Sequence, residues 1–219
     1  DLVVGPQNVQ VLRDVVGPQY FPQKQLAKAV GYTIKGKTIQ PSYVKHLGRL
    51  RIPTLFPELL EEICNIEGLE CIDFISSNPW DFSDKLIDVM AKNVKISRHN
   101  HLPIQSGDSS MLKRMNRWYT REEYLALVQK LKKNIPDITI STDIIVGFCG
   151  ETEEQFEHTV SLAREVGFSK AYVSMYSDRP MTAAHTAYKD DVPHPEKKRR
   201  WLILEELINK TNLRAGTFR

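Results

Sequence analysis

The sequence predicts an α/β protein in which crossover helices join the strands of a parallel sheet, as a complete or a partial (β/α) barrel. Three observations support this fold class. Strand and helix patterns alternate about four times from residue 57 onward. Several predicted helices begin with a capping signal. Each predicted strand ends in glycine or small polar residues, at the end of the sheet where such folds gather their ligands.

The central stretch runs from Ser141 to Phe156 and reads STDIIVGFCGETEEQF. Its apolar and β-branched residues are typical of a buried strand, which stops at Gly147 and Gly150. Thr152, with Gln155 three residues later, has the capping-box pattern and predicts a helix start. Glycines let a ligand approach the backbone, and a helix start offers unpaired N–H groups, so this turn is a candidate binding site.

The other elements follow from periodicity and from start and stop signals. Before the central stretch they are a helix from Pro57 to about Gly68, a strand at residues 71–77, a helix capped by Ser83, a strand at residues 101–105, and a helix opened by the capping box of Thr120 and Glu123. After it they are the helix that stops at Gly167, a strand at residues 170–176 and a last helix from Pro195. Residues 1–56 show no sustained period, which argues against a simple assignment there.

Composition favours a soluble globular protein. The chain has 219 residues, of which 41% are hydrophobic, enough to form the core of one large domain or two small ones. No apolar run approaches the roughly 20 residues of a membrane helix, and the first residues lack a secretory signal, so we expect a cytoplasmic protein with no membrane partner. A net charge of +3 is too small to indicate a nucleic-acid partner by itself.

The sequence holds no metal-binding motif. Cys64, Cys71 and Cys149 have neither the pairing of a disulfide framework nor CxxC-type spacing, and the first two are most simply core residues. His99 and His101 form an HxH pair, but no third ligand stands near them in the sequence. We therefore predict no metal ligand in this chain.

Four long motifs, in order and spacing, resemble the radical S-adenosylmethionine methylthiotransferases. They are NPWDFSDKLIDVM, HLPIQSGDSSMLKRMNRWYTREEYL, STDIIVGFCGETEEQFEHT and YSDRPMTAA, and the match covers roughly residues 56–207. Within that family they are most similar to the branch that methylthiates isopentenyl-modified adenosine next to the anticodon of tRNA.

This resemblance implies a partial TIM-like (β/α) barrel of the radical S-adenosylmethionine type at residues 31–219, with residues 1–30 as a remnant of an N-terminal α/β domain. It implies an enzyme that adds a methylthio group to C2 of the adenosine, and tRNA as its partner. The implied cofactors are S-adenosylmethionine and two four-iron, four-sulfur clusters, which would carry the chemistry while the protein orients the reactants. A monomer is favoured.

The sequence departs from the family pattern near its start. The CxxxCxxC loop that holds the radical-generating cluster is missing, and no cysteine stands between Asp1 and Arg51. Either segments of a longer protein are missing between about residues 17 and 53, or the chain is a relative without clusters. The well-formed barrel motifs favour the first explanation.

Candidate cofactor contacts lie at the predicted strand ends. With the resemblance, they are Gln105, Ser106, Asp143, Gly147, Gly150, Glu151 and Arg179. A carboxylate inside a buried strand is unfavourable unless it is paired, so Asp143 needs a basic partner or a ligand. Arg179 could bind a carboxylate or phosphate bidentately. The alternatives are a structural turn for the glycines, a turn-stabilising role for Gln105 and a structural ion pair for Arg179.

Candidate substrate contacts are Asn78, Trp80 and Arg117. Tryptophan stacks on nucleobases, so Asn78 and Trp80 could border a pocket for an RNA base, and the alternative is that Trp80 lies in the core. Arg117 could neutralise tRNA phosphates. The other basic residues considered with it are Lys113, Arg114, Arg121 and Lys197 to Arg200, although such runs are usually solvated helix faces.

Two other functions stay open. The chain could be a cluster-free barrel that serves as a tRNA-binding or scaffold module. It could also be a sister methylthiotransferase that acts on a ribosomal protein side chain or on threonyl-modified adenosine. The NPWDF and STDIIVGF motifs favour the isopentenyl-adenosine branch.

Overall fold

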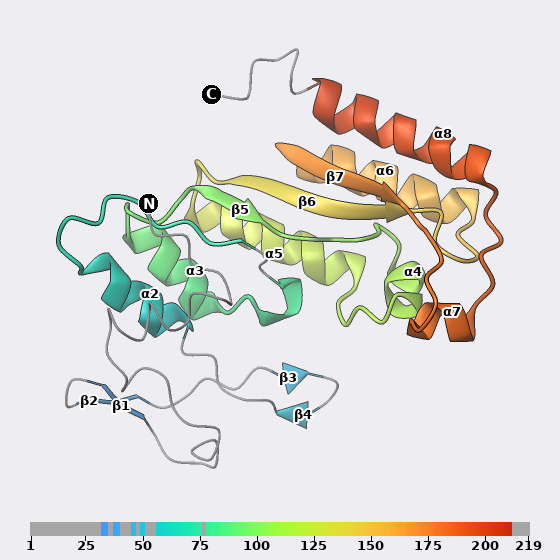
Figure 1. The fold of residues 1–219 in the computed structure, drawn as a ribbon. Coiled ribbons are helices and arrows are strands. Elements are labelled where there is room, and N and C mark those ends of the chain that lie inside the picture. The colour runs from blue at the N-terminus through green and yellow to red at the C-terminus, as the bar shows by residue number, and fades with distance from the viewer. Residues whose placement is uncertain are drawn as a thin grey trace. The chain divides into compact units, whose positions relative to one another are not determined.

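The computed structural model describes residues 56–75 and 78–211, together with four short strands within residues 32–50 (Figure 1). β1 (Tyr32–Ile34) pairs antiparallel with β2 (Lys37–Ile39), and β3 (Lys45–His46) pairs antiparallel with β4 (Arg49–Leu50). The N-terminal remnant predicted at residues 1–30, and most of the interval in which missing segments are expected, lie outside the described residues. Both remain predictions.

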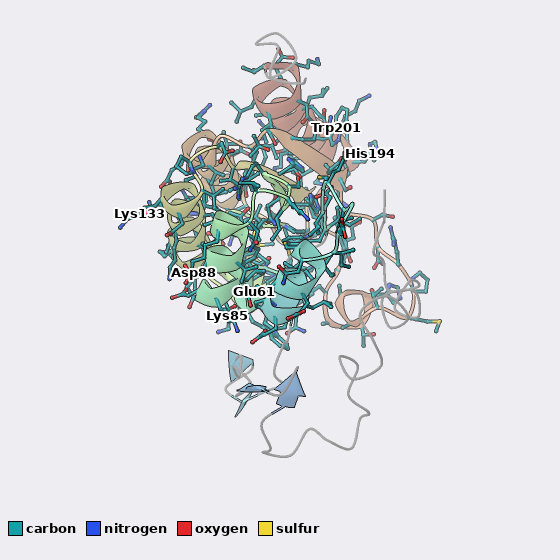
Figure 2. All side chains as sticks on the ribbon, turned by 90° about the vertical axis from the view of Figure 1, so that its left-hand side faces the viewer. Glu61, Lys85, Asp88, Lys133, His194 and Trp201 are labelled. Atoms are coloured by element: carbon teal, nitrogen blue, oxygen red, sulfur yellow. The ribbon has the colours of Figure 1, made fainter. Side chains whose placement is uncertain are left out.

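Contacts divide the chain into two compact units, one formed by residues 1–75 and 81–98 and the other by residues 76–80 and 99–219. In the first unit, α2 (Phe56–Cys64) and α3 (Asp84–Lys92) pack through buried apolar residues. Ser83 caps α3 as predicted, because its hydroxyl accepts a hydrogen bond from the Leu86 N–H. Figure 2 labels three exposed residues of these helices, Glu61, Lys85 and Asp88.

The strand predicted at residues 71–77 is wrong for its described part. Only Ile72 pairs there, in a single parallel bridge with Ile96. Ile72 is buried, whereas Ile75 is 70% exposed, so the apolar side chains of this segment do not share a core that would hold a longer ladder.

The second unit contains a three-stranded parallel sheet in the order β5-β6-β7. The strands are β5 (His99–His101), β6 (Thr139–Val146) and β7 (Lys170–Met175). The first is shorter and earlier than the strand predicted at residues 101–105. Pro103 has no N–H to donate to the ladder, and pairing resumes only at Gln105, which bridges to Ile144.

The helices of the second unit cover one face of this sheet and its carboxyl end (Figure 1). They are α4 (Ser109–Arg114), α5 (Arg121–Asn134), α6 (Glu153–Val166), α7 (Ala183–Ala187) and α8 (His194–Leu204), which continues as a π-helical turn (Glu205–Lys210). A separate 3₁₀ turn (Pro79–Asp81) precedes α3 in the chain. In Figure 1, α5 and α6 lie behind the strands, α8 runs alongside β7, and α4 and α7 lie beyond the strand ends.

Local capping signals place α5 and α6 where they were predicted. The capping boxes of Thr120 with Glu123 and of Thr152 with Gln155 are both complete. The second helix ends at Gly167, whose φ of 64° is left-handed and therefore suits glycine. Among the residues that the structure describes, no helix combines the length and the hydropathy of a membrane span.

The two faces of the sheet differ in burial. On β6, Ile140, Thr142, Ile144 and Val146 are buried beneath the helices, at no more than 3% exposure. The opposite face carries the alternating residues, among them Asp143, which is only half-buried. A barrel sheet with one packed and one open face agrees with the predicted partial barrel, and the open face leads to the candidate site.

We expect Thr152→Ala to lower the free energy of unfolding by about 1 kcal/mol, because the N-cap hydroxyl satisfies a backbone donor at the start of α6. Urea unfolding followed by circular dichroism measures the change. Thr152→Ser keeps the hydroxyl and should match the parent chain, and Glu157→Ala is the control at an exposed position of the same helix. Equal losses in the Ala and Ser variants would contradict the capping role.

Candidate functional site

The carboxyl ends of β6 and β7 open into a cavity of about 520 Å³. Its wall includes three of the predicted contacts, Gln105, Asp143 and Arg179. The aromatic residues Tyr172 and Tyr176 also line it. Successive strand ends therefore bring together a carboxamide, a carboxylate, a guanidinium and two aromatic rings, as the sequence pattern indicated.

Gln105 has a strained backbone at this cavity. It is 92% buried and its φ is 71°, in the left-handed region that few residues other than glycine adopt. Its N–H donates to the carbonyl of Asp143 and its own carbonyl accepts from the N–H of Ile145, both at 2.9 Å. Such strain, on the order of 1 kcal/mol or more, persists only where neighbouring structure fixes it, and it concentrates at functional sites.

The sequence analysis expected Asp143 to have either a basic partner or a ligand. In the structure it has a histidine partner and also lines the cavity. Its side chain is 41% exposed rather than buried in the strand. One carboxylate oxygen lies 3.2 Å from Nε2 of His101. The side chain thus sits on the open face of the sheet, where no desolvation penalty for an isolated charge arises.

Arg179 follows the end of β7 and is exposed. Within the part of the chain that the structure describes, its guanidinium forms no hydrogen bond or ion pair, although its carbonyl accepts from Thr182. The alternative of a structural ion pair is therefore not supported. A planar cation with no partner at a cavity wall is suited to bind a carboxylate or a phosphate.

Ser106 does not line the cavity. It is fully buried, and its hydroxyl lies 3.5 Å from the hydroxyl of Thr159 in α6 and accepts from the N–H of Asp108. The next residue, Gly107, approaches α6 so closely that an added Cβ would lie 2.5 Å from the Thr159 Cα. This segment packs the loop after β5 against α6.

Gly147, Gly150 and Glu151 lie in the turn after β6, outside the cavity wall. The Glu151 carboxylate is 1% exposed and accepts from the Gly147 N–H at 2.6 Å and from Arg200 at 2.8 Å. Burial raises the pKa of Glu151, against the opposing effects of these two donors. The Gly150 N–H donates to Asp191. These contacts give Gly147, Gly150 and Glu151 structural roles in the turn, as the alternative for the glycines proposed, and a cofactor contact at these residues remains a prediction.

Two basic residues of α8 that the sequence analysis considered as phosphate contacts are buried and paired within the protein. Lys197 and Arg200 are each 4% exposed. Lys197 Nζ pairs with Asp190 at 2.6 Å and donates to the carbonyl of Tyr176, while Arg200 pairs with Glu151. The same helix is fixed to the sheet by Trp201, labelled in Figure 2, whose Nε1–H donates to the carbonyl of Val173 in β7.

One predicted substrate contact, Trp80, lies near a second tryptophan, Trp118. The rings of Trp80 and Trp118 are 6.2 Å apart at an angle of 39°, and both side chains are half-buried, so Trp80 is not in the core. Asn78 and Arg117 are exposed. Trp118 was not predicted, although its place directly after Arg117 gave the signal. Asn116, at a left-handed φ of 57°, turns the chain there.

The described residues contain no group of three or more His, Cys, Asp or Glu side chains placed to hold a metal. Cys64 and Cys149 are buried and Cys71 is exposed. His99 and His101 are engaged with neighbouring side chains of β6. None of these residues forms a ligand set with another.

Comparison with known proteins identifies relatives of this chain. A family model described as the radical SAM superfamily matches residues 52–163, about half of the chain. The tRNA-2-methylthio-N(6)-dimethylallyladenosine synthase of Thermotoga petrophila is 49% identical over 155 residues, which is 71% of this chain and 35% of that protein. The Clostridium botulinum protein of the same name is 42% identical over 195 residues, 89% of this chain and 43% of that protein.

A third relative of that name, from Oceanobacillus iheyensis, is 51% identical over 70% of this chain and 29% of that protein. The chain thus spans less than half the length of each of these relatives. Among solved structures, coproporphyrinogen III oxidase (HemN) from Escherichia coli, a radical SAM enzyme, superposes with a TM-score of 0.51 over 68% of this chain and 34% of that one. At 23% identity this likeness concerns the fold alone.

Glu196 of α8 should make stability depend on pH. Hydrogen bonds from Arg199 and then Arg200 lower the pKa of Glu196 to about 2, from a usual value of 4.5. Because the folded-state pKa is depressed, the stabilisation is present above pH 4.5 and is lost as the pH falls toward 2. We expect Glu196→Gln to destabilise the chain by on the order of 1–2 kcal/mol at neutral pH and by much less near pH 2.

Thermal unfolding at both pH values measures this difference. Glu206→Gln is the matched control, because Glu206 pairs with Lys210 on the exposed surface and such pairs contribute little. A loss in Glu196→Gln that is the same at both pH values would contradict the assigned ion pair.

Proposed function

The chain belongs to the radical S-adenosylmethionine superfamily, and from that membership we propose that it is the barrel part of a tRNA methylthiotransferase. Its reaction adds a methylthio group to C2 of N6-isopentenyl (dimethylallyl) adenosine next to the anticodon. All three relatives described above carry the name of this activity, at 42% to 51% identity. This agreement favours the isopentenyl-adenosine branch over the sister branches and over a scaffold role.

The observation that carries the proposal is the chemistry of the cavity at the strand ends. It combines the Asp143 carboxylate, the unpaired Arg179 guanidinium, the Gln105 carboxamide and two tyrosine rings. S-adenosylmethionine presents complementary groups, which are an ammonium, a carboxylate, ribose hydroxyls and an adenine ring. A volume of about 520 Å³ lies within the usual range for small-molecule sites.

We propose distinct roles for the three polar residues. Arg179 binds the ligand carboxylate, Asp143 accepts from its ammonium or hydroxyl groups, and Gln105 orients it without adding charge. When bound, S-adenosylmethionine supplies the methyl group and the reactive adenosyl carbon. The residues of this chain bind and orient the reactants, and Tyr172 and Tyr176 shield them from water.

The cysteines of this chain do not fit an iron–sulfur cluster. A four-iron cluster is held by several thiolates that converge on one point. Cys64 and Cys149 are buried and Cys71 is exposed, and no group of three or more possible metal ligands occurs among the described residues. A cluster of the kind the superfamily uses would therefore take its thiolates from outside this sequence.

For the RNA we propose a contact formed by Trp80, Trp118 and Arg117. Aromatic rings that are only half-buried can stack on unpaired bases, at about 1–3 kcal/mol per base. Lys113 and Arg114 end α4 shortly before Arg117 in the chain, and neither forms an ion pair within the described residues. Arg114 stacks over the Tyr188 ring at 4.8 Å. Because tRNA is modified where it is made and used, we place the protein in the cytoplasm.

We expect loss of the gene from its organism to remove the 2-methylthio group from isopentenyladenosine in tRNA, while the isopentenyl group stays. Mass spectrometry of tRNA nucleosides measures this, and restoring the full-length gene is the control. A persistent methylthio group on isopentenyladenosine, with loss of one from threonyl-modified adenosine or from a ribosomal protein, would instead assign the protein to a sister branch.

We expect Arg179→Gln to weaken binding of S-adenosylmethionine by about 10- to 100-fold, because a charge-assisted hydrogen bond contributes roughly 1.5–3 kcal/mol. Isothermal titration calorimetry of the full-length protein measures the affinity. Lys189→Gln removes a nearby exposed cation that does not line the cavity and should leave the affinity unchanged. Equal effects of the two variants would show a general charge effect instead of a contact.

A further inference from the structure

A row of polar side chains runs along the open face of β5 and β6. His99 Nδ1 lies 3.0 Å from the hydroxyl of Thr139, and His99 Nε2 lies 3.0 Å from the hydroxyl of Ser141. His101 Nδ1 lies 2.9 Å from the same Ser141 hydroxyl, and His101 Nε2 lies 3.2 Å from Asp143. Strand register produces this row, because His99 pairs with Thr139 and His101 with Ser141.

The hydrogen bonds of this row can run in one direction when both rings are neutral. An ionised carboxylate only accepts, so His101 Nε2 must donate to Asp143. Nδ1 of His101 then accepts from the Ser141 hydroxyl, which in turn accepts from Nε2 of His99. Nδ1 of His99 accepts from the Thr139 hydroxyl. The carboxylate at one end thus sets the tautomer of both histidines.

The same arrangement argues against a metal at the HxH pair. Both nitrogens of each ring are engaged by side chains of β6, so neither His99 nor His101 presents a free lone pair. Tyr172 closes a further side of His101, with the two rings edge to face at 5.8 Å. His101 is therefore held in one orientation, and its side chain is only 14% exposed.

The row ends at the cavity. Its last member, Asp143, lines the wall, whereas His101 does not. Only Oδ2 of Asp143 bonds to His101, and within the described residues Oδ1 accepts no hydrogen bond. A carboxylate fixed through one oxygen presents the other at a defined position, which reduces the entropy lost when a ligand binds.

We propose that His101 is a positioning residue, which through this oriented row holds Asp143 so that Oδ1 accepts a hydrogen bond from a hydroxyl or ammonium group of the ligand. The inference rests on the proposed function only for the identity of that ligand. The row itself is a property of β5 and β6 in this chain.

The first test measures binding by calorimetry with the full-length protein. The probes are S-adenosylmethionine, 5′-methylthioadenosine, which has the ribose hydroxyls without the ammonium, and methionine, which has the ammonium without the ribose. His101→Leu and Asp143→Asn should each weaken S-adenosylmethionine binding by about 10-fold. His101→Gln keeps an N–H donor toward Asp143, so its affinity for S-adenosylmethionine should stay within about 3-fold of the parent chain.

The two smaller probes separate the two ligand groups. If Asp143 accepts from ribose, the variants weaken binding of 5′-methylthioadenosine; if it accepts from the ammonium, they weaken binding of methionine. His158→Gln is the matched control, because His158 pairs with Asp108 at 2.8 Å and neither residue lines the cavity. A His101→Leu variant that folds normally and binds every probe like the parent chain overturns the proposal.

The second test reads the tautomers directly. Nitrogen-15 NMR of the imidazole rings at neutral pH should show both His99 and His101 protonated on Nε2, and Ser141→Ala should disturb the signals of both rings. A His101 ring protonated on Nδ1 overturns the row. If the parent chain binds none of the three probes, the proposed function fails, and the tautomers alone then decide whether His101 positions Asp143.

Discussion

The pairing of two buried cations determines how the carboxyl end of the sheet is built. Lys197 and Arg200 of α8 are almost fully buried, and an unpaired buried charge is so unfavourable that each must meet an anion or a carbonyl. Arg200 meets Glu151 after β6, and Lys197 meets Asp190 and the carbonyl of Tyr176 after β7. One helix therefore fixes the ends of both strands. Removing one member of such a pair typically costs about 3–5 kcal/mol.

The contacts of Lys197 and Arg200 also involve the glycine turn after β6, whose residues do not line the cavity. Gly147 suits only glycine, because its φ of 68° is left-handed and an added Cβ would collide with the Lys197 side chain. Its N–H donates to Glu151. The turn thus lies directly against a side chain of α8. The groups that face the cavity belong to the open face of the strands and to the loop after β7. Residues of the turn after β6 thus hold α8 in place, whereas residues of the open face and of the loop after β7 line the cavity.

Local signals predicted α5, α6 and α8 well, whereas α4 and α7 were not predicted. Each capping signal depends only on residues a few positions apart, so it can be read directly from the sequence. Examples are the capping boxes at Thr120 and Thr152 and the helix stop at Gly167. Strand limits were less certain. The lack of a donor at Pro103 moved β5 toward its N-terminal side. Of the described residues 71–75 only Ile72 pairs, because the apolar side chains of this segment share no core.

The site was predictable where it depended on strand ends and not where it depended on distant partners. The rule that ligands gather at the carboxyl ends of parallel strands predicts that Gln105, Asp143 and Arg179 meet at one rim, and all three line one cavity. Their contact with a cofactor remains a prediction. Arg200, the partner of Glu151, lies 49 residues further along the chain, so no local sequence pattern predicts this pair. Trp118 beside Trp80 is a similar case, since 38 residues separate them.

The left-handed backbone of Gln105 restricts which residues can replace it during evolution or engineering. Glycine would relax the main chain but would delete the carboxamide. Asparagine tolerates a positive φ and keeps the amide, but it withdraws that amide from the cavity by one methylene. Each of these substitutions therefore lowers backbone strain but moves or removes the amide that faces the cavity. We expect this position to change slowly in evolution, even where the ligand changes.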